Sequence, residues 1–276
     1  ANGNIFTLPA GFKVVVNDDT GNAKTVDKGI VIEDATDAAT KGSQFVWVPV
    51  GKIYTDVEKT EENAKIISLG RYDFDIKTGA ESEYTGENVE EDKGDTNTAL
   101  KKWGNTIAKS ISEFKTSVTV NGGYYIGRYE VGDENGTAVI KADKTPMANI
   151  IWSTAYNKAK GIGGGPGATT YLCSSYAWDT AINFIQNNGF PNYAKVKEDS
   201  YNENWYDKSV KDLLGNIIKV ANNATRLSTG ETTSKCNIYD MGGNVAEFTT
   251  EVMPNTSEPV VVRGGHYNTN GLASRR

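Results

Sequence analysis

Residues 237–249 are NIYDMGGNVAEFT, and residues 260–272 are VVVRGGHYNTNGL. Each stretch contains two adjacent glycines, which allow a tight backbone path because glycine adopts conformations that are closed to other residues. In the second stretch three β-branched valines precede the glycines, and a short polar and aromatic cluster follows them. We therefore predict a strand that leads to the glycine pair and a surface loop that leaves the sheet there.

The rest of the chain predicts mainly short strands. Residues 28–34 and 42–54 are β-branched and aromatic runs bounded by glycine, and the second run is typical of a buried strand. Residues 121–132, NGGYYIGRYEVG, predict a further strand after a glycine turn. Together with two main helices and much irregular loop, these strands predict an α+β fold with small antiparallel sheets.

Apolar residues at spacings of three and four indicate the two helices. The stripe of the first consists of Leu100, Trp103, Ile107, Ile111, Phe114 and Val118. The second is expected to end before Gly189 and to face inward with Ala177, Trp178, Ala181, Ile182 and Ile185. Residues 150–160 predict a strand that enters a shorter helix capped by Ser153.

Three segments lack this periodicity. Residues 73–97 are acidic and glycine-rich, so we expect a long exposed excursion, with recruitment of calcium by its carboxylates as the alternative. Residues 161–170 are rich in glycine, but no Lys-Ser/Thr pair of a phosphate cradle follows, so we expect a flexible loop. Residues 193–231 are polar and rich in Asn, and we expect long surface loops there.

Composition excludes several classes of function. The net charge of -6 argues against a nucleic-acid partner and against an anionic lipid surface. No apolar stretch approaches the roughly 20 residues of a membrane-spanning helix, and the first residues lack the features of a signal peptide, so we expect any export signal or anchor to have been removed or never to have existed. His266 is the only histidine, which excludes a His-rich metal site and leaves one candidate base for a Ser-His-Asp hydrolase.

The two cysteines, Cys173 and Cys236, lie far apart and form no C-x-x-C pair. Three interpretations stay open at this point. They are buried thiols, a disulfide of an extracellular protein, or ligands of a joint metal site.

Six segments resemble, in sequence and in order, the formylglycine-generating (sulfatase-modifying factor) domain family. They are FVWVPVG, YYIGRYEVG, PMANIIWSTAYNKA, YLCSSYAWDTAI, NIYDMGGNVAEFT and VVRGGHYN. The resemblance implies a C-type-lectin-related fold over residues 42–276, with residues 1–41 as a β-rich lead segment packed on it. Family domains continue into a final strand after the Gly-Gly loop, so we expect that strand to be missing through truncation or disorder, or else to come from another chain.

The resemblance also implies a metal site. Similar segments of the family bind calcium, and here Asn244 and Glu247 would offer the oxygen atoms. The alternative is that Asn244 bonds backbone groups and Glu247 pairs with Arg263 or Arg128.

Catalysis is where this chain departs from the family. The copper-dependent oxidases that it resembles carry a cysteine pair shortly after the Gly-Gly motif, because soft thiolates hold copper(I). The related iron-dependent sulfoxide synthases need several histidines. In this chain the corresponding positions are His266, Tyr267, Asn268, Thr269 and Asn270. We therefore predict that the protein is not an enzyme of this type.

The remaining function is display of a binding surface. Related non-catalytic domains include the variable proteins of diversity-generating retroelements, which vary the residues after an RGG-like motif. By resemblance, the ligand-binding residues would be His266, Tyr267, Asn268, Thr269, Asn270 and Leu272, a mixture of residue types typical of binding loops.

The expected partner is a protein or glycan on a cell or particle surface, and the expected location is extracellular, at the cell surface or on a phage virion. The alternative for the loop is an ordinary polar loop. The alternatives for the chain are a formylglycine-generating oxidase that acts on protein cysteine, and a structural subunit of a filament or phage particle. The chain could also form a homo-oligomer.

Overall fold

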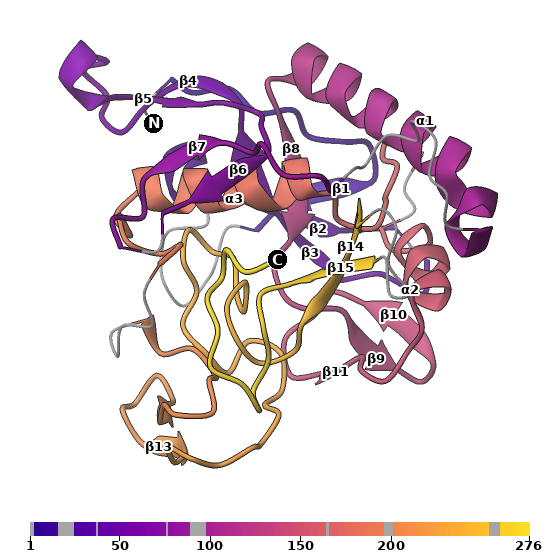
Figure 1. Ribbon diagram of the computed structural model, residues 1–276. Helices are drawn as coiled ribbons and strands as arrows, with labels where there is room; N and C mark the ends of the chain where they lie inside the picture. Colours follow the sequence, from indigo (N-terminus) through magenta and orange to yellow (C-terminus); the bar gives the residue numbers. More distant parts are fainter. Residues whose placement is uncertain are drawn as a thin grey trace.

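The computed structural model describes residues 3–15, 25–36, 38–75, 77–88, 98–163, 166–195, 201–253 and 260–276, with the side chains of the first long helix described from residue 110 onward. This part of the chain consists of three α-helices, two short 3-10 helices (Val26–Lys28 and Glu61–Asn63) and several small antiparallel sheets (Figure 1). The predicted α+β class is confirmed.

The largest sheet has four antiparallel strands in the order β1-β2-β3-β8. They are β1 (Phe12–Val14), β2 (Val31–Asp34), β3 (Gln44–Pro49) and β8 (Gly123–Gly127). Strand β3 lies inside the sheet and is almost fully buried, which agrees with its β-branched and aromatic sequence. Because β1 and β2 pair in the same sheet as β3 and β8, the beginning of the chain shares its main sheet with the later segments.

The prediction of one strand over residues 42–54 is wrong. Strand β3 ends at Pro49, and Gly51 takes a φ of 112°, which favours glycine. From there β4 (Gly51–Tyr54) pairs with β5 (Ala64–Ile67) in a separate two-stranded sheet. The glycine therefore redirects the chain from one sheet to another.

Both main helices are confirmed, as α1 (Thr98–Asn121) and α3 (Ser175–Asn187). All five residues predicted to face inward on α3 are at most 7% exposed. The Ser174 hydroxyl accepts a hydrogen bond from the Ala177 amide and caps α3.

A third helix, α2 (Trp152–Ala159), lies close to its predicted position. The prediction that Ser153 caps this helix is wrong. The N-cap residue is Ile151, which makes no side-chain cap bond, and Ser153 lies inside the first turn.

Five further pairings complete the described sheets. Strand β9 (Gly132–Glu134) pairs with both β10 (Thr137–Val139) and β11 (Thr145–Pro146). Three separate hairpin-like pairs are β6 (Tyr72–Phe74) with β7 (Glu81–Glu83), β12 (Val210–Lys211) with β13 (Ile217–Lys219), and β14 (Glu247–Val252) with β15 (Val260–Arg263).

Helix α3 links the main sheet to the C-terminal strands, because it contacts β3, β5 and β14. The Trp178 indole N–H donates to the Ala273 carbonyl at 3.0 Å, which ties the last residues of the chain to this helix. On the other side, the Tyr124 hydroxyl of β8 donates to the Ala177 carbonyl. Helix α3 therefore supports the last residues of the chain.

Two of the predicted surface excursions have more structure than expected. Residues 73–88 contain part of the β6–β7 hairpin, while residues 89–97 of the predicted acidic loop lie outside the described residues. In the Asn-rich segment, Tyr201, Trp205 and Val210 are at most 6% exposed. The expectation of a purely superficial decoration is therefore wrong for this second segment.

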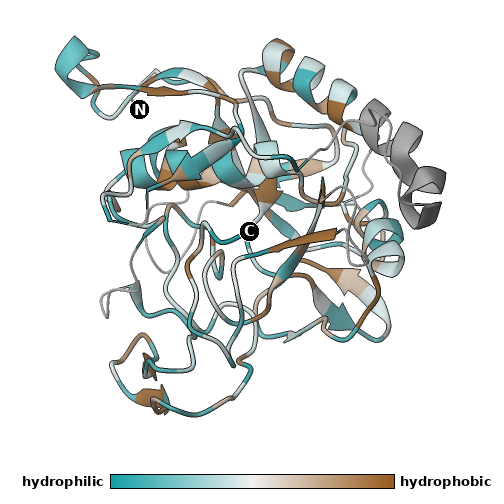
Figure 2. Cartoon of the chain, viewed as in Figure 1, coloured by the Kyte–Doolittle hydropathy of each residue, from teal (hydrophilic) through white to brown (hydrophobic). Residues whose placement is uncertain are grey.

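None of the helices in the described ranges combines the length and apolar character needed to cross a bilayer. Apolar colour marks the β12–β13 hairpin, at the lower edge of Figure 2.

Candidate binding site

The two Gly-Gly segments lie against each other. Gly264 and Gly265 follow β15 with φ values of 79° and 72°, in the left-handed region that favours glycine. The Gly243 amide donates to the Gly264 carbonyl at 3.1 Å, and the Tyr267 amide donates to the Asn244 carbonyl at 2.9 Å. The two glycine pairs therefore fix the departure of the loop by backbone contacts, as the sequence predicts for the strand and the turn.

Residues 266–269 form a closed turn. The Thr269 amide donates to the His266 carbonyl at 2.9 Å, and the Thr269 hydroxyl donates to the same carbonyl at 3.0 Å and accepts from the His266 amide at 3.2 Å. The His266 Nδ1 atom accepts from the Asn268 amide at 3.3 Å. Thr269 and His266 therefore hold the shape of the turn.

A buried tryptophan supports this loop from below. A Cβ atom on Gly265 would lie 2.8 Å from the Trp205 ring, and one on Gly271 would lie 3.1 Å from it. Trp205 is 1% exposed, and its indole N–H donates to Glu203 at 3.0 Å. A side chain at position 265 would collide with this ring, and one at position 271 would be unusually close to it, which accounts for the glycines on both sides of the loop.

The structure brings all six predicted ligand-binding residues into one loop. Asn268 and Asn270 are exposed, and the other four are half-buried: His266, Tyr267, Thr269 and Leu272. The Asn270 side chain accepts a hydrogen bond from the Asp207 amide at 3.3 Å, so it joins the loop to the neighbouring segment.

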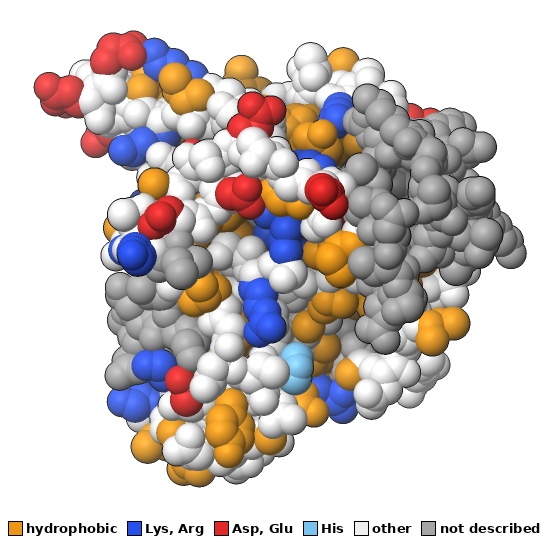
Figure 3. Space-filling view, viewed as in Figure 1, with side chains coloured by type: hydrophobic (Ala, Val, Ile, Leu, Met, Phe, Trp, Pro, Cys, Tyr) orange, Lys and Arg blue, Asp and Glu red, His pale blue; other side chains and the backbone are white. Residues whose placement is uncertain are grey.

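An exposed apolar hairpin follows directly from that neighbouring segment. Its large apolar side chains are between 37% and 88% exposed: Leu213, Leu214, Ile217, Ile218 and Val220. The Asp212 carboxylate bonds the amides of Leu214 and Asn216 at the tip, and the Lys219 ammonium is buried against the carbonyls of Trp205 and Lys208. The charged groups of Asp212 and Lys219 are therefore occupied by backbone, Lys211 is the exposed charge of the hairpin, and the lower edge of the molecule carries an apolar patch (Figure 3). No sequence pattern marked this patch, because neighbouring Ile217 and Ile218 point to opposite sides of a strand.

Arginines under the loop pair with buried carboxylates. Arg263, which is fully buried, lies 2.5 Å from Asp179 and 3.4 Å from Glu251. Arg276 reaches the same two carboxylates at 2.6 and 2.8 Å, and Arg71 reaches Glu251 at 2.7 Å. The predicted pairing of Glu247 with Arg263 or Arg128 is therefore wrong, since Arg263 is engaged elsewhere and Arg128 donates to Gln44.

Of the two residues predicted to bind calcium, Glu247 lines a large cavity, whereas Asn244 is fully buried and its side chain is bonded within the protein. The Asn244 amide oxygen accepts from the Asn204 side chain and from the Leu227 amide, and its nitrogen donates to Glu130 at 2.6 Å. Both lone pairs of that oxygen are therefore used within the protein. Among the described residues no three His, Cys, Asp or Glu side chains are placed to hold a metal ion. This arrangement does not fit calcium at Asn244, and calcium binding stays a prediction for this chain.

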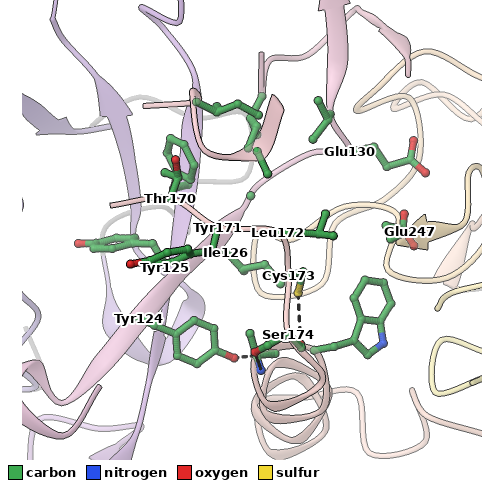
Figure 4. Close-up of a pocket in the computed structure, with 18 of the residues that line it drawn as sticks. Tyr124, Tyr125, Ile126, Glu130, Thr170, Tyr171, Leu172, Cys173, Ser174 and Glu247 are labelled. Atoms are coloured by element: carbon green, nitrogen blue, oxygen red, sulfur yellow. Dashed lines mark hydrogen bonds between the residues drawn. The ribbon is translucent and has the colours of Figure 1, made fainter. Parts of the chain in front are cut away.

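The cavity has a volume of about 1030 Å³ and lies between α1, β8, the segment 167–174 and the start of β14. Figure 4 shows Tyr124, Tyr125, Leu172 and Cys173 around it, with the carboxyl groups of Glu130 and Glu247 directed toward each other at one end. His266 and Tyr267 of the loop also line it. Sequence reasoning did not find this cavity, because its walls come from many segments that are far apart along the chain.

The cysteines are separate thiols. Cys173 lines the cavity and is half-buried, whereas Cys236 is buried, and the structure forms no disulfide between them. Burial raises the pKa of Cys236 to about 12, so its thiol stays protonated at neutral pH.

Comparison with known families agrees with this architecture. The model of the sulfatase-modifying factor enzyme 1-like domain matches residues 32–276, and the chain belongs to this family. No match was found among curated proteins or among solved structures.

Proposed function

We propose that the chain is a non-catalytic binding protein of this family, with the loop of residues 266–272 as its ligand face. The observation that carries this proposal is that one set of groups holds the shape of the loop while another side chain of the loop is exposed. Backbone atoms, Thr269, the Asn270 side chain and the Trp205 ring hold its shape, while the Asn268 side chain is exposed. Substitution of an exposed side chain then changes the surface without changing the support.

The ligand class proposed is a protein on a cell or particle surface, with a glycan as the alternative. The apolar hairpin at residues 210–220 supports a protein ligand, because exposed apolar patches beside polar loops are typical of protein contacts. We accordingly place the protein outside the cell, at a cell surface or on a virion. Diversification of the loop by a retroelement belongs to the same proposal and would be visible as a near-duplicate of the 3′ coding end beside a reverse transcriptase.

The test screens the purified chain against a glycan array and a displayed random-peptide library. The double variant Tyr267→Ala/Asn268→Ala should lose the ligands that the unaltered chain binds. Asn268→Ala alone should change the free energy of unfolding by less than about 0.5 kcal/mol, as is usual for surface positions. The matched variant Thr269→Ala should cost about 1 kcal/mol, because it removes hydrogen bonds within the turn. Equal binding by the double variant, or unfolding caused by Asn268→Ala, would contradict the proposal.

The oxidase alternative has its own test. Neither cysteine lies in the loop after Gly265, so we expect no oxidation of a Cys-containing sulfatase-type peptide when copper is added. Turnover that Cys173→Ser or Cys236→Ser abolishes would replace the binding proposal by an enzymatic one.

A structural subunit is the second candidate function, and the hairpin is the observation that favours it. If the hairpin were an assembly contact, sedimentation would show an oligomer that Leu213→Ser/Leu214→Ser dissociates. If the chain is instead a monomer at high concentration, the hairpin is not an assembly contact, and we would assign it to the ligand-binding surface.

A further inference from the structure

One end of the cavity carries three carboxyl groups, from Glu130, Asp240 and Glu247. Glu130 and Asp240 are 8% and 2% exposed. Glu130 accepts hydrogen bonds from the Asn244 side chain and, at 2.7 Å, from the Val245 amide. By contrast, Asp240 Oδ2 and Glu247 Oε2 are buried and have no hydrogen-bond partner within the described residues.

No basic side chain of the described ranges forms an ion pair with this group. None of the three carboxyl groups has a Lys, Arg or His nitrogen within 4 Å there. The buried cation Lys235 acts on Asp240 only through space, since it donates to the carbonyls of Tyr201 and Thr233 and lies 3.4 Å from Glu203. Buried carboxyl groups that lack a counter-charge are costly, so the site is suited to a positive charge from outside.

The remainder of the cavity is apolar and aromatic. Tyr124, Tyr125, Tyr171 and Leu172 lie around it in Figure 4, and Phe248 lines it beside Glu247. A volume of about 1030 Å³ lies at the upper limit of pockets that hold small organic molecules. Aromatic faces attract cations as well as apolar groups, so both ends of the cavity favour the same kind of molecule.

We propose that this cavity binds a small organic cation, an amine or quaternary ammonium compound with an aromatic or apolar body, whose positive group lies against Glu130, Asp240 and Glu247. The geometry favours such a cation over a metal ion. A metal needs several oxygen atoms converging on one point, whereas both Glu130 oxygens already accept N–H groups. An ammonium group needs only nearby negative charge and a ring face.

The site should respond to pH. Burial raises the pKa of Glu130 and of Glu247, and repulsion among the three carboxyl groups adds to this. Burial also raises the pKa of Asp240 to about 6, although Thr232 and Lys235 oppose the shift. Glu203, Tyr193 and Arg128 are the other titratable or charged groups around the cluster. A bound cation favours the ionised carboxylates, so its affinity should rise as pH rises through this range.

The experiment uses benzyltrimethylammonium and 2-phenylethylammonium as probes, with 2-phenylethanol as the uncharged match, in calorimetry on the full chain. We expect both cations to bind at least tenfold more tightly than the alcohol. Binding of the quaternary probe, whose charge does not titrate, should weaken at least tenfold from pH 8 to pH 5. The probes should also protect Cys173 from alkylation, since its thiol lines the same cavity.

Glu247→Gln and Asp240→Asn should each weaken the cations tenfold or more and leave the alcohol unchanged. Glu62→Gln, an exposed glutamate far from the cavity lining, is the matched control. If a cavity variant fails to fold, the proposal is tested by the pH dependence of probe binding to the unaltered chain. Equal binding of the alcohol, no binding of any probe at millimolar concentration, or binding of calcium without the amines would each overturn the proposal.

Discussion

Strand β14 carries two glutamates, Glu247 and Glu251, whose surroundings are opposite in charge although both lie on the same short strand. Glu251 lies among Arg71, Arg263 and Arg276. Glu247 lies beside Glu130 and has no such partner among the described residues. The difference teaches that one end of the strand is built to hold the fold together, while the other places a carboxyl group without an ion-pair partner at a cavity.

The pKa directions follow from these surroundings. Burial alone would raise the pKa of Glu251, but the three arginines hold it below its usual value. Burial also raises the pKa of Asp179, and Arg263 and Arg276 oppose that shift, so this carboxylate is the less firmly ionised of the two. At the other end, burial and neighbouring carboxyl groups act in the same direction on Glu247.

The largest effect is expected from Arg263→Ala. This change leaves Asp179 and Glu251 buried with fewer counter-charges, and it removes the contact of the guanidinium with the Trp178 ring. We expect a loss of about 3–5 kcal/mol in the free energy of unfolding, measured by denaturant titration. Arg275→Ala, at an exposed neighbouring arginine, is the control and should be close to neutral. A loss below about 1 kcal/mol for Arg263→Ala would remove the arginine cluster as a stabilising element.

Matched glutamate-to-glutamine changes compare the two ends directly. Glu251→Gln should destabilise by about 3 kcal/mol, because three arginines then share one buried carboxylate fewer. Glu247→Gln should stabilise by about 1 kcal/mol at pH 8, because the amide can donate to Glu130 and carries no charge. Thermal and denaturant unfolding at pH 8 give both numbers. Loss of stability in both variants would mean that the two glutamates have the same role.

The smallest effect is the pH dependence of stability. A carboxyl group with a raised folded-state pKa binds more protons in the folded protein than in the unfolded chain, so stability falls as pH rises from its unfolded pKa to its folded pKa. For Asp240 this window extends from about 3.8 to about 6. We expect stability to decline across that window, and the decline to be shallower in Asp240→Asn. Identical slopes for the two proteins would contradict the raised pKa.

The parts of the fold predicted from sequence are those with a local signal. The apolar spacing of α3 and the valines before Gly264 are examples, because each signal consists of residues that are close together along the chain. The resemblance of six segments identified the family that the comparison confirms. The change from one sheet to another at Gly51 could not be predicted, because glycine occurs both within strands and in several types of turn.

The candidate site was predicted only in its outer part. The loop after Gly265 is marked by its own sequence, but its support by Trp205 comes from an Asn-rich segment without periodicity. The pairing of Arg71 with Glu251 joins residues 180 positions apart. The acidic end of the cavity likewise combines Glu130, from the connection between β8 and β9, with Glu247, at the start of β14, and only the folded chain brings them together. No pattern of neighbouring residues in the sequence predicts contacts of this kind.

Side-chain carboxyl NMR titration of the unaltered protein tests the central comparison most directly. With ¹³C-labelled Asp and Glu, and with Glu247→Gln, Glu251→Gln and Asp240→Asn used to assign the signals, each carboxyl group reports its own protonation. The account predicts that Asp240 titrates at about 6, that Glu247 titrates above its usual value of 4.5, and that Glu251 titrates below it. If Glu247 and Glu251 titrated together near the usual value, the two ends of β14 would not differ in charge, and both the stabilising cluster and the cation site would lose their basis.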